Sequence, residues 1–267
     1  MCYDISLKAK NEHFLELIPE LKSDWEDEEL EELELTSGLT YPVYPVLVNE
    51  GNNYYLKKME WGLIPASLNT PEKVKQFRKN MLNARSDRFI NDPKSIWHKF
   101  RNQRCLIPVT GIFEHRHIHG WKNTIPYHVK QKDRDLFFLP GFYAYTGEKN
   151  PLTGDRRGTF VFLTHEANSL MAKIYNRDEK DPRMPLFLPS EAEMLWLDRQ
   201  ASEAQILEIA NTNFPADHLE SWPVYSIRKG RNFNGRRPDG LGASDPYKWP
   251  GLPELGNDRP VEQGSLF

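Results

Sequence analysis

The first two residues, Met1 and Cys2, have the most distinctive chemistry in the sequence. Methionine aminopeptidase removes an initiator Met when the next side chain is small, so we expect the mature chain to begin with Cys2. Its α-amine would titrate at about 7.7–8.0 and its thiol at about 8.5. The amine can condense with an aldehyde to an imine, and the thiol can then close on the imine carbon to give a five-membered thiazolidine. Any second codon can encode Cys, so Cys2 alone does not establish this chemistry.

A single carboxylate, Glu114, follows the largely apolar residues 105–113. A carboxylate in such a run is either an exposed strand residue or a buried acid, and a buried acid needs a partner or a function. Glu114 is therefore a candidate for proton transfer.

Cationic and aromatic side chains alternate in residues 83–89 and 97–101. If exposed, such a surface suits a phosphate backbone with stacked bases. The alternative is an ordinary amphipathic helix with Trp97 and Phe100 in the core. The sequence alone leaves both interpretations open.

The composition is that of a globular protein, with 39% hydrophobic and 27% charged residues among 267 and a net charge of −3. Much of the negative charge lies in residues 24–34, which we interpret as a solvated helix face. There is no apolar run long enough to span a bilayer and no signal-peptide core at the start, so we expect a cytoplasmic location and no membrane contact. With only two cysteines, we expect no disulfide framework, no metal site and no cofactor.

Short strands with helices between them predict an α+β fold around a curved, largely antiparallel sheet or barrel with short flanking helices. A helical stretch is predicted over residues 11–35, broken at Pro19, and another begins at Thr70 as N-cap. Residues 165–168 are predicted to open a helix that runs to Ile174. Strands are predicted at residues 3–9, 41–48, 54–60, 104–109, 126–130, 136–145, 159–164 and 182–188. The turn signal at residues 49–52 predicts that the second and third of these strands form a hairpin.

The character of the chain changes after Tyr225, where Gly, Pro, Asn and Arg become frequent. We expect one domain over residues 2–228. Residues 229–267 are expected to form a flexible, Gly/Pro/Arg-rich C-terminal tail that is disordered or draped over the surface.

Several short motifs, in one order along the chain, resemble the SRAP family, the SOS-response-associated peptidase or abasic-site processing proteins. They extend from residue 2 to about Tyr225. They are Cys2, Trp61-Gly62-Leu63-Ile64-Pro65, Asn83-Ala84-Arg85, Arg104-Cys105-Leu106-Ile107-Pro108-Val109, Gly111-Ile112-Phe113-Glu114, Thr164-His165-Glu166-Ala167-Asn168 and Arg183-Met184-Pro185.

The resemblance implies a single SRAP domain that binds single-stranded DNA and crosslinks to an abasic site through Cys2, shielding the site from strand cleavage. It implies that Cys2 is the nucleophile, that Asn83 holds the α-amine or the sugar, and that Glu114 transfers protons. The DNA-binding residues that it implies are Arg85, Arg88, Trp61, Pro65 and Arg183. The chemistry agrees, because a closed deoxyribose exposes no aldehyde until a general acid/base opens the ring.

The sequence departs from the family pattern in two places. Asp4 stands where the family usually has a basic or neutral residue, which removes one phosphate contact. Tyr175 occupies the position of the family's active-site His, and a phenol with a pKa near 10 is a poor proton shuttle. His165 could compensate, although we expect it only to cap its helix.

These departures leave three functions open: covalent capture of abasic sites with β-elimination as a side activity, a thiol peptidase limited to self-processing, and a non-catalytic single-stranded DNA-binding module. The chain also ends in Gln263-Gly264-Ser265-Leu266-Phe267, which resembles the short peptides with which bacterial repair enzymes dock on the sliding clamp. In this interpretation Leu266 and Phe267 fill an apolar groove on the clamp. The alternative is that they fold back onto the domain.

Overall fold

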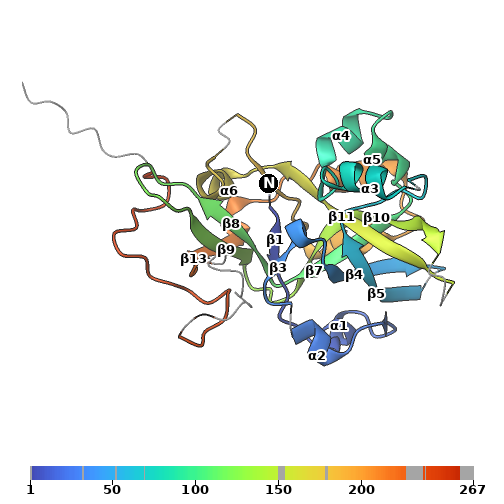
Figure 1. The fold of residues 1–267 in the computed structure, drawn as a ribbon, viewed down its shortest axis with the longest axis horizontal. Coiled ribbons are helices and arrows are strands. Elements are labelled where there is room, and N and C mark those ends of the chain that lie inside the picture. Colours follow the sequence, from blue (N-terminus) through green and yellow to red (C-terminus); the bar gives the residue numbers. More distant parts are fainter. Residues whose placement is uncertain are drawn as a thin grey trace, which may run out of the picture.

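A computed structural model of the protein describes residues 2–31, 33–51, 53–68, 70–149, 154–177, 180–226, 237 and 239–258. Its centre is a ring of strands in which each strand pairs with the next, and the parallel pairing of β11 with β5 closes the ring (Figure 1). The other pairs in the ring are antiparallel. The strands of the ring are β4 (Val43–Glu50), β5 (Asn53–Trp61), β7 (Arg104–Val109), β10 (Phe137–Lys149) and β11 (Arg156–Glu166).

A second sheet, entirely antiparallel, carries the start of the chain. In it β1 lies between β8 and β3, with Asp4 opposite Phe113 and Ile5 opposite Ile112. This pairing fixes the first residues of the chain against a buried strand. The members of this sheet are β13 (Leu219–Pro223), β9 (Ile125–Gln131), β8 (Gly111–Arg116), β1 (Asp4–Ser6) and β3 (Thr36–Ser37).

Short strands and helices flank the two sheets. The remaining strands are β2 (Lys22–Ser23), β6 (Asn83–Arg85) and β12 (Arg183–Pro185). The helices are α1 (Asn11–Leu17), α2 (Asp27–Glu31), η1 (Gly38–Thr40), α3 (Pro71–Arg78), α4 (Ser86–Asn91), α5 (Ile96–Lys99), α6 (Ser169–Ile174), α7 (Ser190–Leu197), α8 (Glu203–Ala210) and η2 (Ala216–His218). The predicted α+β fold with a curved, largely antiparallel sheet and short helices is confirmed.

Large aromatic side chains fill the core. Trp61 is fully buried, stacks on Phe160 and donates its indole N–H to the Leu82 carbonyl at 2.8 Å. Trp97 and Phe100 are also buried, so their amphipathic-helix interpretation is confirmed and they do not form a surface for bases.

Local signals were reliable where the interactions are local. The predicted hairpin is formed by β4 and β5, and Thr70 caps α3 by accepting a hydrogen bond from the Lys73 N–H, with Pro71 as the first helical residue. The helical stretch predicted over residues 11–35 with a break at Pro19 is formed by two short helices: α1 ends at Leu17, before Pro19, and α2 follows after β2. His165 does not begin a helix, because it lies in β11 opposite Met184, and Asn168 caps α6 by accepting from the N–H groups of Leu170 and Met171.

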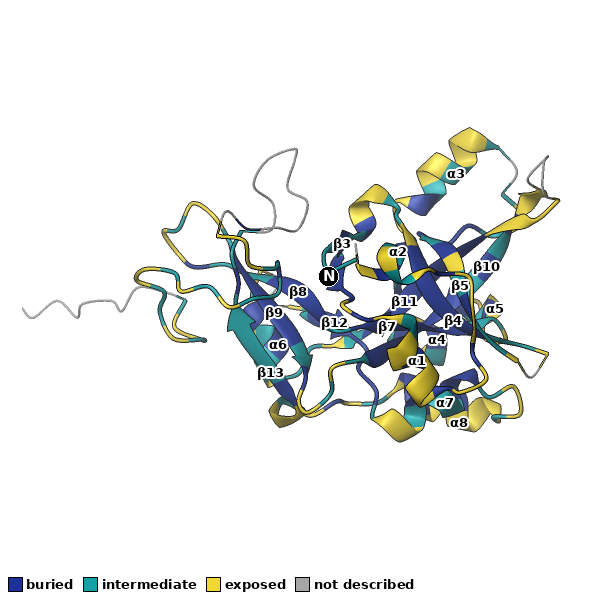
Figure 2. Cartoon of the chain, turned by 90° about the horizontal axis from the view of Figure 1, so that it is seen from below, coloured by how far each residue is buried: buried dark blue, intermediate teal, exposed yellow. Residues whose placement is uncertain are grey.

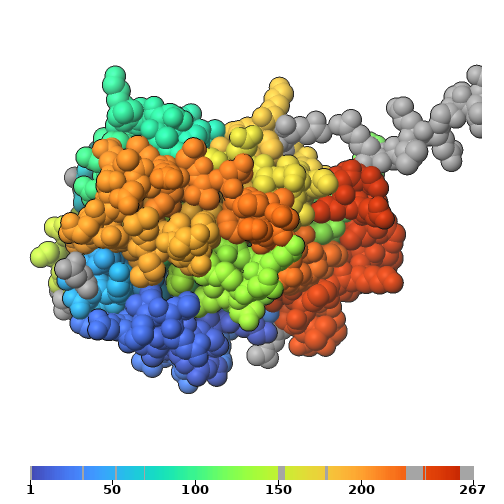
Figure 3. Space-filling model, turned by 180° about the vertical axis from the view of Figure 1, so that it is seen from behind, coloured from blue at the N-terminus to red at the C-terminus, as the bar shows by residue number. Residues whose placement is uncertain are grey.

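The described part of the C-terminal segment, residues 239–258, packs on the domain (Figure 3, red). The fully buried Arg116 side chain donates to Asp258 at 2.5 Å and to the carbonyls of Pro253 and Glu254. Trp249 donates its indole N–H to the Val224 carbonyl. The domain boundary at residue 228 stays a prediction, and the stretch 239–258 beyond it is ordered by these contacts.

No helix among the described residues has both the length and the apolar character needed to cross a membrane. The described residues also contain no group of three or more His, Cys, Asp or Glu side chains placed to hold a metal ion. The predicted clamp-binding peptide, residues 263–267, lies outside the described residues.

Candidate active site around Cys2

Cys2 lies shortly before β1, close to the start of the chain, which Figure 2 marks with N. It is 1% exposed, and its thiol faces the carbonyl oxygens of Asp4 at 3.4 Å and Phe113 at 3.8 Å. Its own carbonyl accepts a hydrogen bond from Asn83 Nδ2 at 2.9 Å. Asn83 stands at the start of β6, which β11 positions by parallel pairing. The fold therefore brings together two residues separated by 81 positions in sequence.

Glu114 lies in β8, the strand that pairs with β1, and is 3% exposed. Its negative charge acts on Cys2. Burial raises the pKa of the Cys2 thiol well above its usual value, and the carboxylates of Glu114 and Asp4 raise it further. The buried-acid interpretation of Glu114 thus holds, with the thiol as its electrostatic neighbour. The thiol stays protonated near neutral pH, so it needs a base to become a nucleophile.

A cavity of about 520 Å³ opens beside this pair. The strands β6, β8 and β12 contribute to its wall, together with residues just before β1 and β9 and just after α6. The lining residues are Tyr3, Arg85, Glu114, His115, His117, Thr124, Tyr175, Arg177, Asp181 and Arg183. Glu114 and three arginines therefore face one space, which can hold an anionic sugar phosphate next to a carboxylate.

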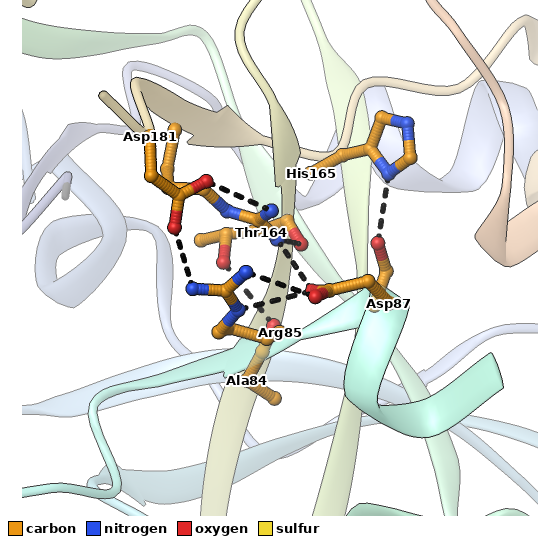
Figure 4. A network of polar contacts seen from close by, with 8 residues as sticks. Ala84, Arg85, Asp87, Thr164, His165 and Asp181 are labelled. Atoms are coloured by element: carbon orange, nitrogen blue, oxygen red, sulfur yellow. Dashed lines mark hydrogen bonds and ion pairs between the residues drawn. The ribbon is translucent and has the colours of Figure 1, made fainter. Parts of the chain in front are cut away.

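Two of the three cavity arginines, Arg85 and Arg183, are held by two carboxylates (Figure 4). Arg85 donates to Asp181 at 2.6 Å and to both oxygens of Asp87, while Arg183 donates to Asp87 at 3.0 Å and to the Thr164 carbonyl. Burial disfavours the charged form of Asp87, but the hydrogen bond from Arg85 and the positive charge of Arg183 outweigh it, so the Asp87 pKa is lowered. The arginines are thus preorganised, and Asp181 occupies a donor position that a phosphate could take.

Not all the residues predicted to contact DNA lie at this cavity. Arg85 and Arg183 line it. Trp61 is enclosed in the core and cannot stack on a base, because all its ring surface is covered by the protein. Pro65 is half-buried and Arg88 is exposed, and neither belongs to the cavity wall.

The two predicted substitutes for a histidine lie in different places. Tyr175 follows α6 and lines the cavity beside Glu114. His165 does not line it: its Nδ1 is 2.9 Å from Ser86 Oγ, and the residue lines a separate hollow with Asn168 and Phe214. Burial, followed by the positive charge of Arg183, lowers the pKa of His165. His165 is therefore a structural contact between β11 and α4.

Sequence reasoning missed His115, His117 and Arg177, which share the cavity with Glu114. The pattern Glu114-His115-Arg116-His117 was visible in the sequence as two histidines closely following the candidate acid. The pairing partners Asp87 and Asp181 were not predictable, because they reach Arg85 from positions 2 and 96 residues away.

Comparison with known proteins shows to which family the chain belongs. The family model described as SOS response associated peptidase (SRAP) matches residues 1–227. The chain is 30% identical over 203 residues to the abasic site processing protein YoqW of Bacillus subtilis, covering 72% of this chain and 83% of that protein. It is 29% identical over 201 residues to the abasic site processing protein YobE of the same organism, covering 72% of this chain and 85% of that protein.

Solved structures share the fold. A crystal structure of a protein from Bacteroides thetaiotaomicron superimposes with a TM-score of 0.75 at 27% identity, covering 92% of this chain and all of that one. A phage-related protein from Bordetella bronchiseptica gives a TM-score of 0.61 at 21% identity, covering 85% of this chain and 95% of that one. With the family model matched over most of its length and the fold shared with these structures, the chain belongs to the SRAP family.

Proposed function

We propose that this protein captures abasic sites in single-stranded DNA as a covalent thiazolidine on Cys2, after removal of Met1. The observation that carries the proposal is that the charge of the buried Glu114 acts on the Cys2 thiol, while Glu114 itself lines a cavity walled by arginines. The relatives from Bacillus subtilis are named abasic site processing proteins, which supports the same substrate for this chain.

The reaction proceeds in balanced steps. The deoxyribose ring opens to an aldehyde, the α-amine of Cys2 attacks C1′, and water leaves to give an imine. The thiol then adds to the imine carbon and its proton passes to the nitrogen. Glu114 would take the thiol proton and pass it on to the nitrogen, a role supported by its charge acting on that thiol.

Asn83 would hold the nucleophile in place. Its Nδ2 donates to the Cys2 carbonyl, and its Oδ1 is buried with no hydrogen-bond partner among the described residues. A buried amide oxygen without a donor is costly, so an ammonium or amine donor there would be stabilised. We propose that Oδ1 accepts from the α-amine of the mature chain or from a hydroxyl of the sugar.

We further propose that Arg85 and Arg183 contact the DNA backbone from the cavity wall. The peptidase activity in the family name would be confined to self-processing. The hydrogen bonds of the Cys2 thiol within the described part of the chain go to carbonyl oxygens and not to an imidazole, so a Cys–His nucleophile is not formed there. β-Elimination through the imine would be a side activity.

The test uses single-stranded DNA containing one uracil, treated with a glycosylase to create an abasic site. We expect a gel-shifted adduct that survives denaturation and is absent with Cys2→Ala. Intact DNA serves as the control substrate. An unchanged adduct in Cys2→Ala would reject the mechanism.

The same gel separates this proposal from a non-catalytic module. A module that only binds single strands predicts salt-sensitive affinity that is equal for abasic and intact DNA, with no covalent product. Tyr175→His tests whether the replacement of the family's histidine by Tyr175 slows the reaction. Faster crosslinking, or faster reversal of the crosslink, would show that it does.

The contact with the sliding clamp is a second partner proposal. It depends on Leu266 and Phe267, and apolar anchors of that size give affinity of roughly micromolar order once ordering is subtracted. A fluorescence titration of a peptide of residues 258–267 against purified clamp tests it. If no saturable binding is seen, or if the double substitution Leu266→Ala and Phe267→Ala leaves binding unchanged, the proposed contact with the sliding clamp is ruled out.

A further inference from the structure

The chemistry of ring opening needs two proton-transfer groups at the sugar. One must take the proton from the C1′ hydroxyl while the other protonates the ring oxygen as the bond from C1′ to that oxygen breaks. A single buried carboxylate such as Glu114 can do one of these at a time. This requirement, which rests on the proposed function, directs attention to the other titratable side chains in the cavity.

Most of those side chains are poorly suited to exchange protons near neutral pH. Burial, followed by the charge of Glu114, raises the pKa of Tyr3 above its ordinary value of 10. Asp181 is tied to Arg85 by an ion pair at 2.6 Å. Arginines do not titrate in this range. The histidines, His115 and His117, have side chains whose ordinary pKa lies near neutrality.

The backbone of His117 is held at the cavity by two hydrogen bonds with the side chain of Asn176. Its N–H donates to Asn176 Oδ1 at 2.8 Å, and its carbonyl accepts from Asn176 Nδ2 at 2.7 Å. Asn176 directly follows Tyr175, another residue of the cavity wall. These two hydrogen bonds therefore join the end of β8 to the segment after α6. They fix the Cα position of His117 without using its side chain.

The imidazole itself remains available to a ligand. Its ring nitrogens make no hydrogen bond or ion pair to the described part of the chain, and the residue is half-buried in the cavity wall. Burial, with the positive charge of Arg177 second, lowers the pKa of His117 from its ordinary value, so the ring is neutral at physiological pH. A neutral imidazole can accept one proton and donate another.

We propose that His117 is the second proton-transfer residue, which contacts the deoxyribose and acts with Glu114 to open its ring. In this step one group removes the C1′ hydroxyl proton, the bond from C1′ to the ring oxygen breaks, and the other group protonates that oxygen. The products are the C1′ aldehyde and a free 4′ hydroxyl. Formation of the imine and thiazolidine follows at Cys2 without further need of His117.

The test compares two substrates in single-turnover crosslinking. One is single-stranded DNA with an abasic site. The other carries an internal aldehyde, made by periodate oxidation of a diol spacer, that has no hydroxyl with which to close a ring. We expect His117→Gln to slow crosslinking to the abasic site by about 100-fold and to leave the rate with the ring-free aldehyde within about twofold of wild type.

The ring-free aldehyde also serves as the folding control for the variant, and His115→Gln is the matched neighbour in the same cavity. Normal reaction of His117→Gln with the abasic site, or an equal slowing with both substrates, would overturn the role of His117 alone. A loss with the abasic substrate in His115→Gln but not in His117→Gln would also overturn it. A wild-type protein that forms no adduct with either substrate would overturn the proposed function and this role together.

Discussion

The Cys2 thiol is fully buried, and this burial, followed by the charges of Glu114 and Asp4, raises its pKa and keeps it protonated. This arrangement suits a thiol that acts second, after an amine has captured an aldehyde, because the imine carbon is a strong electrophile. It suits a peptidase poorly, because attack on an amide needs a thiolate from the outset. The order of events, amine first and thiol second, is thus consistent with the electrostatics of the residue.

Exchange of Glu114 for Gln should slow crosslinking by Cys2 and at the same time make its thiol easier to alkylate. Loss of the proton-transfer group should slow crosslinking by about 100-fold. Loss of its negative charge should lower the pKa of the Cys2 thiol from its raised value, because that charge is the second cause of the rise after burial. Iodoacetamide should then alkylate Cys2 faster, as followed by mass spectrometry.

Glu166→Gln is the control for Glu114→Gln, because Glu166 is an exposed carboxylate on β11 that does not line the cavity. It should change neither rate. If Glu114→Gln crosslinked at the wild-type rate, Glu114 would not be the proton-transfer group.

At the scale of elements, the ion-pair network between β6, α4 and the loop before β12 sets the charge that the cavity offers to DNA. Asp181 occupies one donor position of Arg85 at 2.6 Å. Asp181→Asn should free that position for a phosphate and tighten binding of single-stranded DNA by about two- to tenfold at low salt. Fluorescence anisotropy at several salt concentrations measures this change.

Asp135→Asn is the matched control, because it adds the same charge at a fully exposed carboxylate that pairs with Lys130. If both variants tightened binding equally, net charge and not the release of Arg85 would be the cause.

The second sheet contains a buried histidine that should make stability depend on pH. His128 lies in β9 with Nε2 3.0 Å from Ser6 Oγ, and burial, followed by the charge of Lys130, lowers its pKa from 6.5 to about 3. The unfolded chain takes up a proton below pH 6.5 while the folded chain does not, so stability is complete above that pH and is lost as pH falls. Between about pH 7 and pH 5 we expect a loss of about 2 kcal/mol from this group.

Urea unfolding at a series of pH values tests this expectation. The pH dependence should be flatter by that amount in His128→Gln and unchanged in His119→Gln, where the side chain is exposed. An identical slope in wild type and His128→Gln would show that His128 does not stay neutral in the folded protein.

The sequence allowed prediction of the local part of these elements. The turn between β4 and β5 and the cap at Thr70 depend on neighbouring residues, and both were identified. The parallel closure of β11 on β5 and the pairing of β6 with β11 depend on contacts between distant residues and leave no local pattern. His165 was assigned to the helix α6 because Asn168, the residue that caps this helix, lies only three positions further along the chain.

The candidate site was predictable to a similar degree. Cys2, Asn83 and Glu114 were named through the ordered motifs of the family and do meet in space. Trp61 was assigned to the DNA surface by its motif. Burial of its large apolar ring is favourable, however, because its indole N–H finds a hydrogen-bond partner in the Leu82 carbonyl. His117 was missed because its place in the cavity depends on backbone hydrogen bonds to Asn176, 59 residues further along the chain.

At the scale of the whole molecule, residues 239–258 pack against the domain. Arg116 is fully buried and has Asp258 as its charged partner at 2.5 Å. Asp258→Ala should destabilise the protein by about 2 kcal/mol, since a hydrogen bond to a buried charge is lost, and lower Tm by about 4–8 °C. Asp135→Ala should leave Tm unchanged, because its ion pair is exposed. Equal Tm values for the two variants would show that the segment is not anchored through Arg116.

The central claim is that one residue, Cys2, forms the covalent bond to DNA through its α-amine and its thiol together. Mass spectrometry of the adduct after trypsin and nuclease digestion tests this most directly. The account predicts a peptide of residues 2–8, without Met1, that carries the deoxyribose remnant less one water, with fragment ions that place the added mass on Cys2. An adduct on a lysine side chain, or an adducted peptide that still begins with Met1, would contradict it.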